Sequence, residues 1–262
     1  MNGQRFREKV AVVTGGNKGI GLGVAKAYAR EGASVAITGR DEKTLAAAAE
    51  EIGRGTLAIK SDAGKISDIE NAMASIRDRF GRIDALFVNA GAGKFTPLEE
   101  VTEAFFDDTF SVNVKGLLFT VQKAVPLMRS GSAVVLNASI NGHMAMPNTT
   151  VYAASKAAVI SLAKTLSIEL VERGIRVNSI SPGPIESTFL SRELSSEELQ
   201  QTKDWIVSQS DLENSPRYSQ RYPPRPRRGF LTIANASPLP ASHQAGTRAL
   251  LDQSCLRFPA EA

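Results

Sequence analysis

The feature that most constrains the fold is a regular alternation of short apolar runs with helix-like segments over the first 180 residues. The runs are rich in Val, Ile, Leu and Ala and cover residues 10–13, 34–38, 56–59, 85–88, 133–136 and 175–180. The helical segments cover residues 21–30, 42–52, 66–80, 102–128 and 151–172. The runs do not alternate apolar with polar residues, which is typical of strands covered on both faces. We therefore predict an α/β fold, a doubly wound parallel sheet with helices on both faces.

The alternation stops after about residue 201, which sets the expected domain boundary. Residues 215–228 contain four prolines interleaved with five arginines, a composition that neither a helix interior nor a central strand accepts. Residues 232–236 are apolar enough for a strand, but prolines follow at once. We expect one α/β domain over residues 1–201 and a poorly ordered Arg/Pro-rich tail over residues 202–262.

Charge and composition exclude some classes of protein. From Thr202 onward there are eight basic and five acidic residues, so most of the net charge of +4 belongs to the tail and the body is nearly neutral. Nothing in the body indicates a nucleic-acid partner. We expect neither a membrane span nor a signal peptide, and the single cysteine fits a reducing compartment, so we expect a cytoplasmic location.

A glycine-rich string follows the first apolar run and opens the first helix. Residues 14–21 have the spacing Gly-x-x-x-Gly-x-Gly, which lets the backbone approach a pyrophosphate at the start of a helix. Candidate cofactor-binding residues here are Gly15, Asn17, Lys18, Gly19, Ile20 and Gly21. The alternative is an ordinary glycine-rich connection between a strand and a helix.

The end of the second apolar run indicates which dinucleotide is preferred. NAD-binding proteins usually place a carboxylate there to bind the ribose 2′-OH, whereas this chain has Arg40 and no carboxylate until Asp41. A guanidinium suits a 2′-phosphate, and Lys18 can share that charge. The two cations favour NADP(H) over NAD(H). The alternative is that Arg40 is only a surface residue at a strand end.

Tyr152 and Lys156 lie four residues apart, which on a helix places both side chains on one face. A cation beside a phenol favours the phenolate, so we expect the pKa of Tyr152 to fall toward neutrality. Such a phenol could exchange a proton with an alcohol or carbonyl oxygen. The alternative is a pair of solvated surface residues.

Taken together, residues 8 to about 190 resemble the short-chain dehydrogenase/reductase family of Rossmann-fold oxidoreductases. The matching strings occur in the family's order: residues 14–21, Asp62-Ala63, Asn89-Ala90-Gly91, Asn113, Ser139, Tyr152-x-x-x-Lys156 and Pro182-Gly183-Pro184-Ile185 with Thr188.

The resemblance implies a catalytic set of Asn113, Ser139, Tyr152 and Lys156. Tyr152 would be the general acid or base, Ser139 would bind the substrate oxygen, and Asn113 would anchor a water of the proton relay. Lys156 would lower the pKa of Tyr152 and bind the nicotinamide ribose. The further cofactor-binding residues implied are Arg40, Asp62, Ala63, Asn89, Ala90, Gly91, Tyr152, Lys156, Pro182, Gly183, Ile185 and Thr188.

Several of these residues have simpler explanations when taken singly. Asn113 could be a capping residue and Ser139 a strand-end hydroxyl. His143 could touch substrate or be solvated. Apolar residues near the expected substrate region could form a pocket or simply pack: Met144, Met146, Phe189, Leu190 and Trp205. With one cysteine and two histidines, we expect no metal site.

The chain departs from the family after about residue 208, where a further helix and a last strand near Asp-Gly-Gly are expected. We predict that the last strand is missing, with reduced stability and a disturbed homodimer or homotetramer as the consequence. One hypothesis is that the tail is read from a shifted frame. Reading the coding DNA in the other two frames tests it, because one of them should then encode the missing helix and strand.

Three functions remain open at this stage. The first is an NADP(H)-dependent oxidoreductase that interconverts a small carbonyl and a secondary alcohol by hydride transfer. The second is a dinucleotide-binding protein whose catalysis is impaired by the aberrant C-terminus. The third is a binder of nucleic acid or an acidic partner through the tail, which deletion of the residues after Gln201 would abolish.

Overall fold

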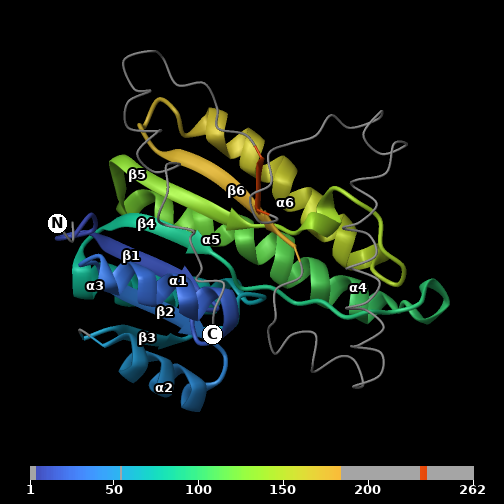
Figure 1. Ribbon diagram of the computed structural model, residues 1–262, viewed down its shortest axis with the longest axis horizontal. Helices are drawn as coiled ribbons and strands as arrows, with labels where there is room; N and C mark the ends of the chain where they lie inside the picture. The colour runs from blue at the N-terminus through green and yellow to red at the C-terminus, as the bar shows by residue number, and fades with distance from the viewer. Residues whose placement is uncertain (1–3, 54, 184–230, 235–262) are drawn as a thin grey trace. The chain divides into compact units, whose positions relative to one another are not determined.

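Each of the six apolar runs forms a strand of one parallel sheet (Figure 1). The structure is a computed structural model and describes residues 4–53, 55–183 and 231–234. The strands are β1 (Val10–Thr14), β2 (Ser34–Gly39), β3 (Leu57–Lys60), β4 (Ile83–Val88), β5 (Met128–Asn137), β6 (Arg176–Pro182) and β7 (Leu231–Ala234). Their order is β3-β2-β1-β4-β5-β6-β7, and the pairings from β1 to β6 are all parallel. The predicted fold class is confirmed.

The parallel sheet of β1 to β6 has six strands, which agrees with the prediction that the family's last strand is missing. The strand order continues to β7, which has four residues and overlaps the apolar segment that the sequence allows as a strand. Nothing in the chain near β7 corresponds to the Asp-Gly-Gly of the family pattern.

The strand order reverses at β1, and this reversal positions the site. β1 pairs with β2 on one side and with β4 on the other, with Thr14 opposite Thr38 and Val13 opposite Phe87. In a doubly wound sheet, the loops that follow the strands diverge at this point and leave a crevice at the carboxyl ends of the strands. The glycine-rich string follows β1 into that crevice.

The helices fall into two groups because right-handed crossovers reverse face when the strand order reverses. Helices α1 (Gly19–Arg30) and α2 (Glu42–Ile52) contact one another on one face. Helices α3 (Ile66–Phe80), α5 (Leu117–Ala124) and α6 (Thr150–Glu169) follow the crossovers to the other side, where α3 contacts α5. The main core lies there, with these buried members: Met73, Ile76, Leu117, Val121, Val159, Ala163, Leu86, Val134 and Leu136.

The long helix expected over residues 102–128 is interrupted. The structure has α4 (Glu103–Phe110), a π-helical stretch η2 (Ser111–Gly116), α5 and a short 3₁₀ turn η3 (Val125–Leu127). Asn113 lies in the widened turn of η2 and bonds backbone groups outside its own helix. A sequence period cannot reveal such long-range contacts, and π turns occur preferentially at functional sites.

Helix α6 has the length and apolar composition of a membrane-crossing helix. It is also a core helix, since Val159, Ala163 and Leu166 are buried in the main core. Core helices satisfy the same criteria, so these two properties carry no argument for a membrane.

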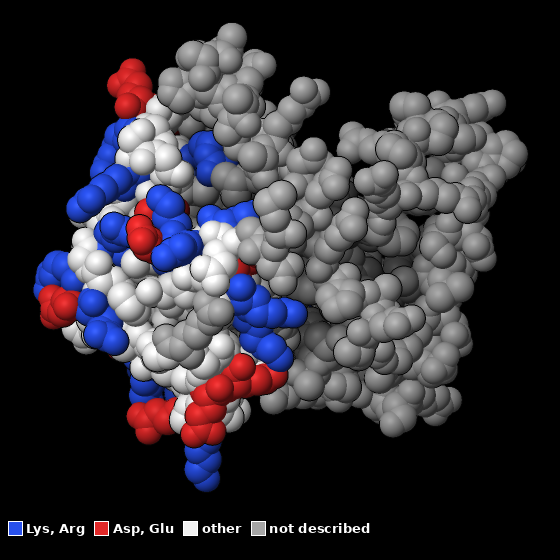
Figure 2. All heavy atoms as spheres, turned by 60° about the vertical axis from the view of Figure 1, so that its left-hand side comes forward, with Lys and Arg blue, Asp and Glu red and all other residues white. Residues whose placement is uncertain are grey.

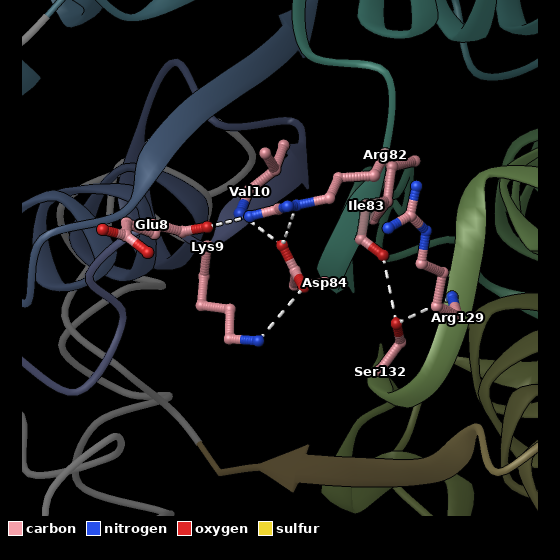
Figure 3. A network of polar contacts seen from close by, with 8 residues as sticks. All are labelled: Glu8, Lys9, Val10, Arg82, Ile83, Asp84, Arg129 and Ser132. Atoms are coloured by element: carbon pink, nitrogen blue, oxygen red, sulfur yellow. Dashed lines mark hydrogen bonds and ion pairs between the residues drawn. The ribbon is translucent and has the colours of Figure 1, made fainter.

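The amino ends of β1 and β4 are joined by a charged network around Asp84 (Figure 3). Its carboxylate accepts hydrogen bonds from the Val10 backbone N–H at 2.8 Å and from Arg82 Nε at 3.1 Å. Lys9 Nζ lies 3.4 Å from the other carboxylate oxygen. Arg82 also donates to the carbonyl of Glu8. The first residues of the two strands are therefore held together by ionic hydrogen bonds, at the opposite end of the strands from the glycine-rich string.

β5 begins five residues before the predicted start, and a serine explains how its early part stays paired. Met128 pairs with Ile83, after which the register shifts. Ser132 Oγ donates to the Ile83 carbonyl and accepts from the Arg129 N–H, both at 3.1 Å (Figure 3). The buried hydroxyl thus satisfies two backbone groups that the irregular register leaves without ladder partners.

Charged residues of both signs are interspersed on the described surface in Figure 2. Several form ion pairs between neighbouring elements, such as Arg5 with Glu31 at 2.8 Å and Lys123 with Glu70 at 2.7 Å. Exposed pairs of this kind contribute little stability individually.

Candidate active site

The loop after β1 is held tightly against the end of β4. Asn89 Nδ2 donates to the carbonyls of Thr14 and Gly15, each at 3.1 Å. Thr14 Oγ1 in turn accepts from the backbone N–H of Asn89 at 2.9 Å and of Ala90 at 3.0 Å. A Cβ at Gly21 would stand 2.6 Å from Asn89 Nδ2, so this close approach requires glycine. The predicted residues of both strings are thus brought together.

The start of α1 provides a cradle for an anion. Gly19 has φ +54°, and no atom lies within 4 Å of where its Cβ would be. The N-cap residue, Lys18, makes no side-chain capping bond, so the first N–H groups of the helix, including those of Ile20 and Gly21, keep the positive end of the dipole accessible. These features fit a pyrophosphate, and hence the dinucleotide predicted from the sequence.

The loop after β2 carries the cations that the sequence singled out. Arg40 is exposed and makes no ion pair with any residue that the structure describes. Asp41 caps α2, accepting from the Thr44 N–H at 2.7 Å. The hydrogen bonds from Thr44 lower the pKa of Asp41, and nearby Lys43 and Lys18 add smaller effects in the same direction. The carboxylate that could bind a ribose hydroxyl is therefore engaged in capping.

Asn17 and Asp62 are engaged within the fold. Asn17 Nδ2 donates to Thr44 Oγ1 at 2.8 Å, which ties the glycine-rich loop to α2. Asp62 Oδ1 accepts from the Gly64 N–H at 3.0 Å, which shapes the loop after β3, and Ala63 lies between them. Both residues lie in loops that follow strands at the same edge of the sheet, as the sequence predicts.

Asn113 is almost fully buried, at 1% exposure, and its carboxamide is fully used. Its Oδ1 accepts from the Ala92 N–H, and its Nδ2 donates to the Ala92 carbonyl, each at 2.7 Å. Nδ2 also donates to Ser155 Oγ at 2.9 Å, and Ser155 Oγ donates to the Tyr152 carbonyl at 2.7 Å. Asn113 therefore joins the loop after β4 to the first turn of α6.

Tyr152 and Ser139 form the reactive pair. Their side chains share a hydrogen bond, which lowers the pKa of Tyr152. Burial has the larger effect and raises that pKa above its ordinary value. The expectation that Lys156 brings the pKa of Tyr152 toward neutrality is therefore wrong for this site, because burial outweighs the influence of neighbouring groups.

Lys156 is held beside the Tyr152 ring by a backbone carbonyl. Its Nζ donates to the Asn137 carbonyl at 2.9 Å and lies 5.6 Å from the centre of the Tyr152 ring. The side chain is 5% exposed, and burial lowers the pKa of Lys156 to about 8. A lysine with this pKa is mostly charged at pH 7 and loses its charge a little above it.

The remaining predicted residues have different outcomes. His143 is exposed, and its Nε2 lies 2.9 Å from Ser181 Oγ. Gly91 lies close to the catalytic set, since its Cβ would stand 3.5 Å from Lys156 Nζ. Met144 is exposed, and Pro182 ends β6 immediately before Gly183. The residues that lie outside the described ranges are Ile185, Thr188, Phe189, Leu190 and Trp205.

Two residues of the site were missed from the sequence. Ser155 links Asn113 to the backbone of Tyr152. Asn137 binds both Lys156 and Asn89. The signal for Asn137 was available, because a polar side chain at the end of an apolar strand has to find a partner when it is buried.

Comparisons with known proteins agree with this geometry. Residues 9–199 match the family model described as short chain dehydrogenase. The chain is 38% identical to the oxidoreductase asL5 of Sarocladium schorii, over 72% of this chain and 77% of that protein. It is also 38% identical to a sorbitol dehydrogenase of Cereibacter sphaeroides, over 70% of this chain and 72% of that protein. Among solved structures, a short chain dehydrogenase from Burkholderia cenocepacia in complex with NADP superposes with a TM-score of 0.68 and 34% identity, covering 70% of this chain and 77% of the other.

Proposed function

The chain is an enzyme of the short-chain dehydrogenase family, and on that premise we propose that it is an NADP(H)-dependent oxidoreductase that interconverts a carbonyl compound and a secondary alcohol. The observation that carries the proposal is the hydrogen-bonded pair of half-buried Tyr152 and buried Ser139, with Lys156 behind the phenol ring and the glycine-rich loop on the same edge of the sheet. The homologous sorbitol dehydrogenase supports an alcohol or carbonyl substrate.

Tyr152 supplies the proton in this proposal. Because burial raises its pKa, the phenol keeps its proton at neutral pH and is ready to donate it to a carbonyl oxygen. The Ser139 hydroxyl bonds the same phenol, so a substrate oxygen bound by Ser139 would lie within reach of the proton. A protonated phenol is the form that carbonyl reduction requires.

Lys156 and Asn113 support this proton transfer. A charged Lys156 over the Tyr152 ring stabilises the negative charge that develops on the phenol oxygen as the proton leaves. Asn113 fixes Ala92 and, through Ser155, the first turn of α6, so Tyr152 is held in place. When it is bound, the dinucleotide supplies the hydride.

The preference for NADP(H) rests on Arg40 and Lys18. Arg40 is an exposed guanidinium at the end of β2, and Lys18 acts on Asp41 in the adjacent loop, so both cations lie near one loop. Asp41 is occupied as a helix cap, which removes the carboxylate that would favour NAD. The Burkholderia cenocepacia neighbour in complex with NADP agrees with this assignment.

The proposal is tested with the purified full-length chain. We expect NADPH to be consumed with small ketones or dicarbonyls, and NADH to bind more weakly and turn over more slowly. Tyr152→Phe should bind NADPH but not turn over. Consumption of NADPH at an equal rate by Tyr152→Phe would contradict the proposed role of Tyr152, and a preference for NADH would contradict that of Arg40.

A second function, dinucleotide binding without turnover, is favoured by the departure of the sequence from its family after about residue 208. In that case the wild-type chain would bind NADPH with no turnover on any carbonyl of the panel. Titration of binding and assay of turnover on the same preparation separate the two functions.

A further inference from the structure

One polar residue of the site, Asn137, has no role in the proposed function. It ends β5, opposite Ile180 of β6, and is 8% exposed. Its Nδ2 donates to Asn89 Oδ1 at 2.9 Å, and its backbone carbonyl accepts from Lys156 Nζ at 2.9 Å. Asn137 therefore contacts the residue that holds the glycine-rich loop and the lysine behind the phenol.

The orientation of these carboxamides follows from their partners. The carbonyls of Thr14 and Gly15 can only accept, so Asn89 must direct its Nδ2 toward them and its Oδ1 toward Asn137. Asn137 must then donate with its own Nδ2. A continuous path of hydrogen bonds thus runs from Gly15 through Asn89 and Asn137 to Lys156.

Asn137 does not serve stability alone. Its Oδ1 is buried without a hydrogen-bond partner among the described residues, which carries a free-energy penalty. An apolar residue at this position would carry no such penalty. The carboxamide is best explained by the one contact that an apolar side chain cannot make, the donation to Asn89.

We propose that Asn137 is a positioning residue that holds the dinucleotide loop in register with Lys156. Its side chain fixes Asn89, and through Asn89 the carbonyls of Thr14 and Gly15. Its backbone fixes the Lys156 ammonium. Loss of the side-chain donor should loosen the loop on which the dinucleotide binds and the strand end that anchors the lysine. The inference rests on the proposed function for the identity of the ligand.

The experiment compares two variants with one control. Asn137→Leu removes the donor but keeps the branching of the side chain, and Asn137→Asp removes the donor while adding a negative charge to the residue whose carbonyl binds Lys156. Asn178→Asp is the matched control, because Asn178 is a half-buried asparagine of β6 that bonds neither Asn89 nor Lys156. NADPH dissociation constants, urea unfolding and the pKa of Lys156 are measured, the last by NMR titration of the lysine-labelled chain without nucleotide.

We expect both Asn137 variants to raise the NADPH dissociation constant about tenfold, as for loss of a partner to a buried acceptor. Only Asn137→Asp should raise the pKa of Lys156 above its value of about 8, and the control should change neither. A wild-type dissociation constant in Asn137→Leu, or an unchanged Lys156 pKa in Asn137→Asp, overturns the proposal. If the wild-type chain does not bind NADPH, the proposed function fails, and the NMR titration alone then decides the inference.

Discussion

Neighbouring strands are joined by different polar groups at the two ends of the sheet. At the amino ends, β1 and β4 are joined by the Asp84 carboxylate, which is partly exposed and accepts bonds from Val10, Arg82 and Lys9. At the carboxyl ends, β1, β4 and β5 are joined by the neutral carboxamides of Asn89 and Asn137, of which Asn137 is buried.

The difference shows what each end is suited for. Ions at the partly solvated end can be paired without a large desolvation cost. At the carboxyl end a fixed charge would dominate the electrostatics of the site, whereas neutral amides leave Lys156 as its one buried ammonium within the described residues. We infer that the amino end stabilises the fold and that the carboxyl end sets the chemistry.

The largest expected effect is on the chemical step. Tyr152→Phe removes the proton donor, so turnover should fall by about 10²- to 10⁴-fold, while NADPH binding and unfolding stay close to wild type. Steady-state kinetics, nucleotide titration and urea unfolding on one preparation measure the three properties. A large loss of stability in Tyr152→Phe would show that the carboxyl end also stabilises the fold, and would contradict the different roles of the two ends.

The next effect is a pH dependence of the free energy of unfolding, which we expect from Lys156 at the carboxyl end of the sheet. Between pH 8 and 10.5 the unfolded chain holds a proton on Lys156 that the folded chain has lost, so the stability of the wild type rises with pH in this window. Below pH 8 both the folded and the unfolded chain hold the proton, so the free-energy cost of burying the charged Lys156 does not change with pH. Lys156→Met lacks this rise, so its stability relative to wild type should fall by about 3 kcal/mol across the window.

Urea unfolding at pH 7.5, 9 and 10.5 measures this difference. Lys164→Met is the matched control, since Lys164 is exposed on the same helix and should follow the wild type. Parallel pH profiles for Lys156→Met and the wild type would mean that the ammonium is not buried at a cost.

The amino end should respond in stability alone. Asp84→Ala leaves the Val10 N–H and two cations without their shared acceptor, so we expect a loss of about 2 kcal/mol with an unchanged NADPH dissociation constant. Asp78→Ala is the control, because Asp78 only pairs with Arg77 at the surface and should change stability by less than about 0.5 kcal/mol. Weaker NADPH binding in Asp84→Ala would show that the two ends are coupled.

The smallest expected effect is on the preference for NADPH over NADH. Arg40→Ala removes an exposed cation, so NADPH should bind about tenfold more weakly while NADH binding and stability stay unchanged. Fluorescence titration with both nucleotides measures the ratio. Equal losses for NADPH and NADH would show that Arg40 does not contact a 2′-phosphate.

Much of the fold and the site followed from local patterns. The apolar runs predicted β1 to β6, and the positions of Gly15, Gly19 and Gly21 predicted a tight turn between β1 and α1. The π-helical turn at Asn113 could not be predicted, because it depends on Ala92 and Ser155, which are distant in the chain. The polar side chain of Asn137 at the end of an apolar strand was visible in the sequence, but its partners were not, since they come from two other elements.

The sequence by itself determined which residues form strands and helices and placed Tyr152 and Lys156 one turn apart, because spacing along a helix is a local property. Only the tertiary structure decided how these two residues ionise. Burial raises the pKa of Tyr152 and lowers that of Lys156, and burial depends on what the rest of the chain packs around them. The number of residues between two ionisable groups can be read from the sequence, but their desolvation depends on the folded structure.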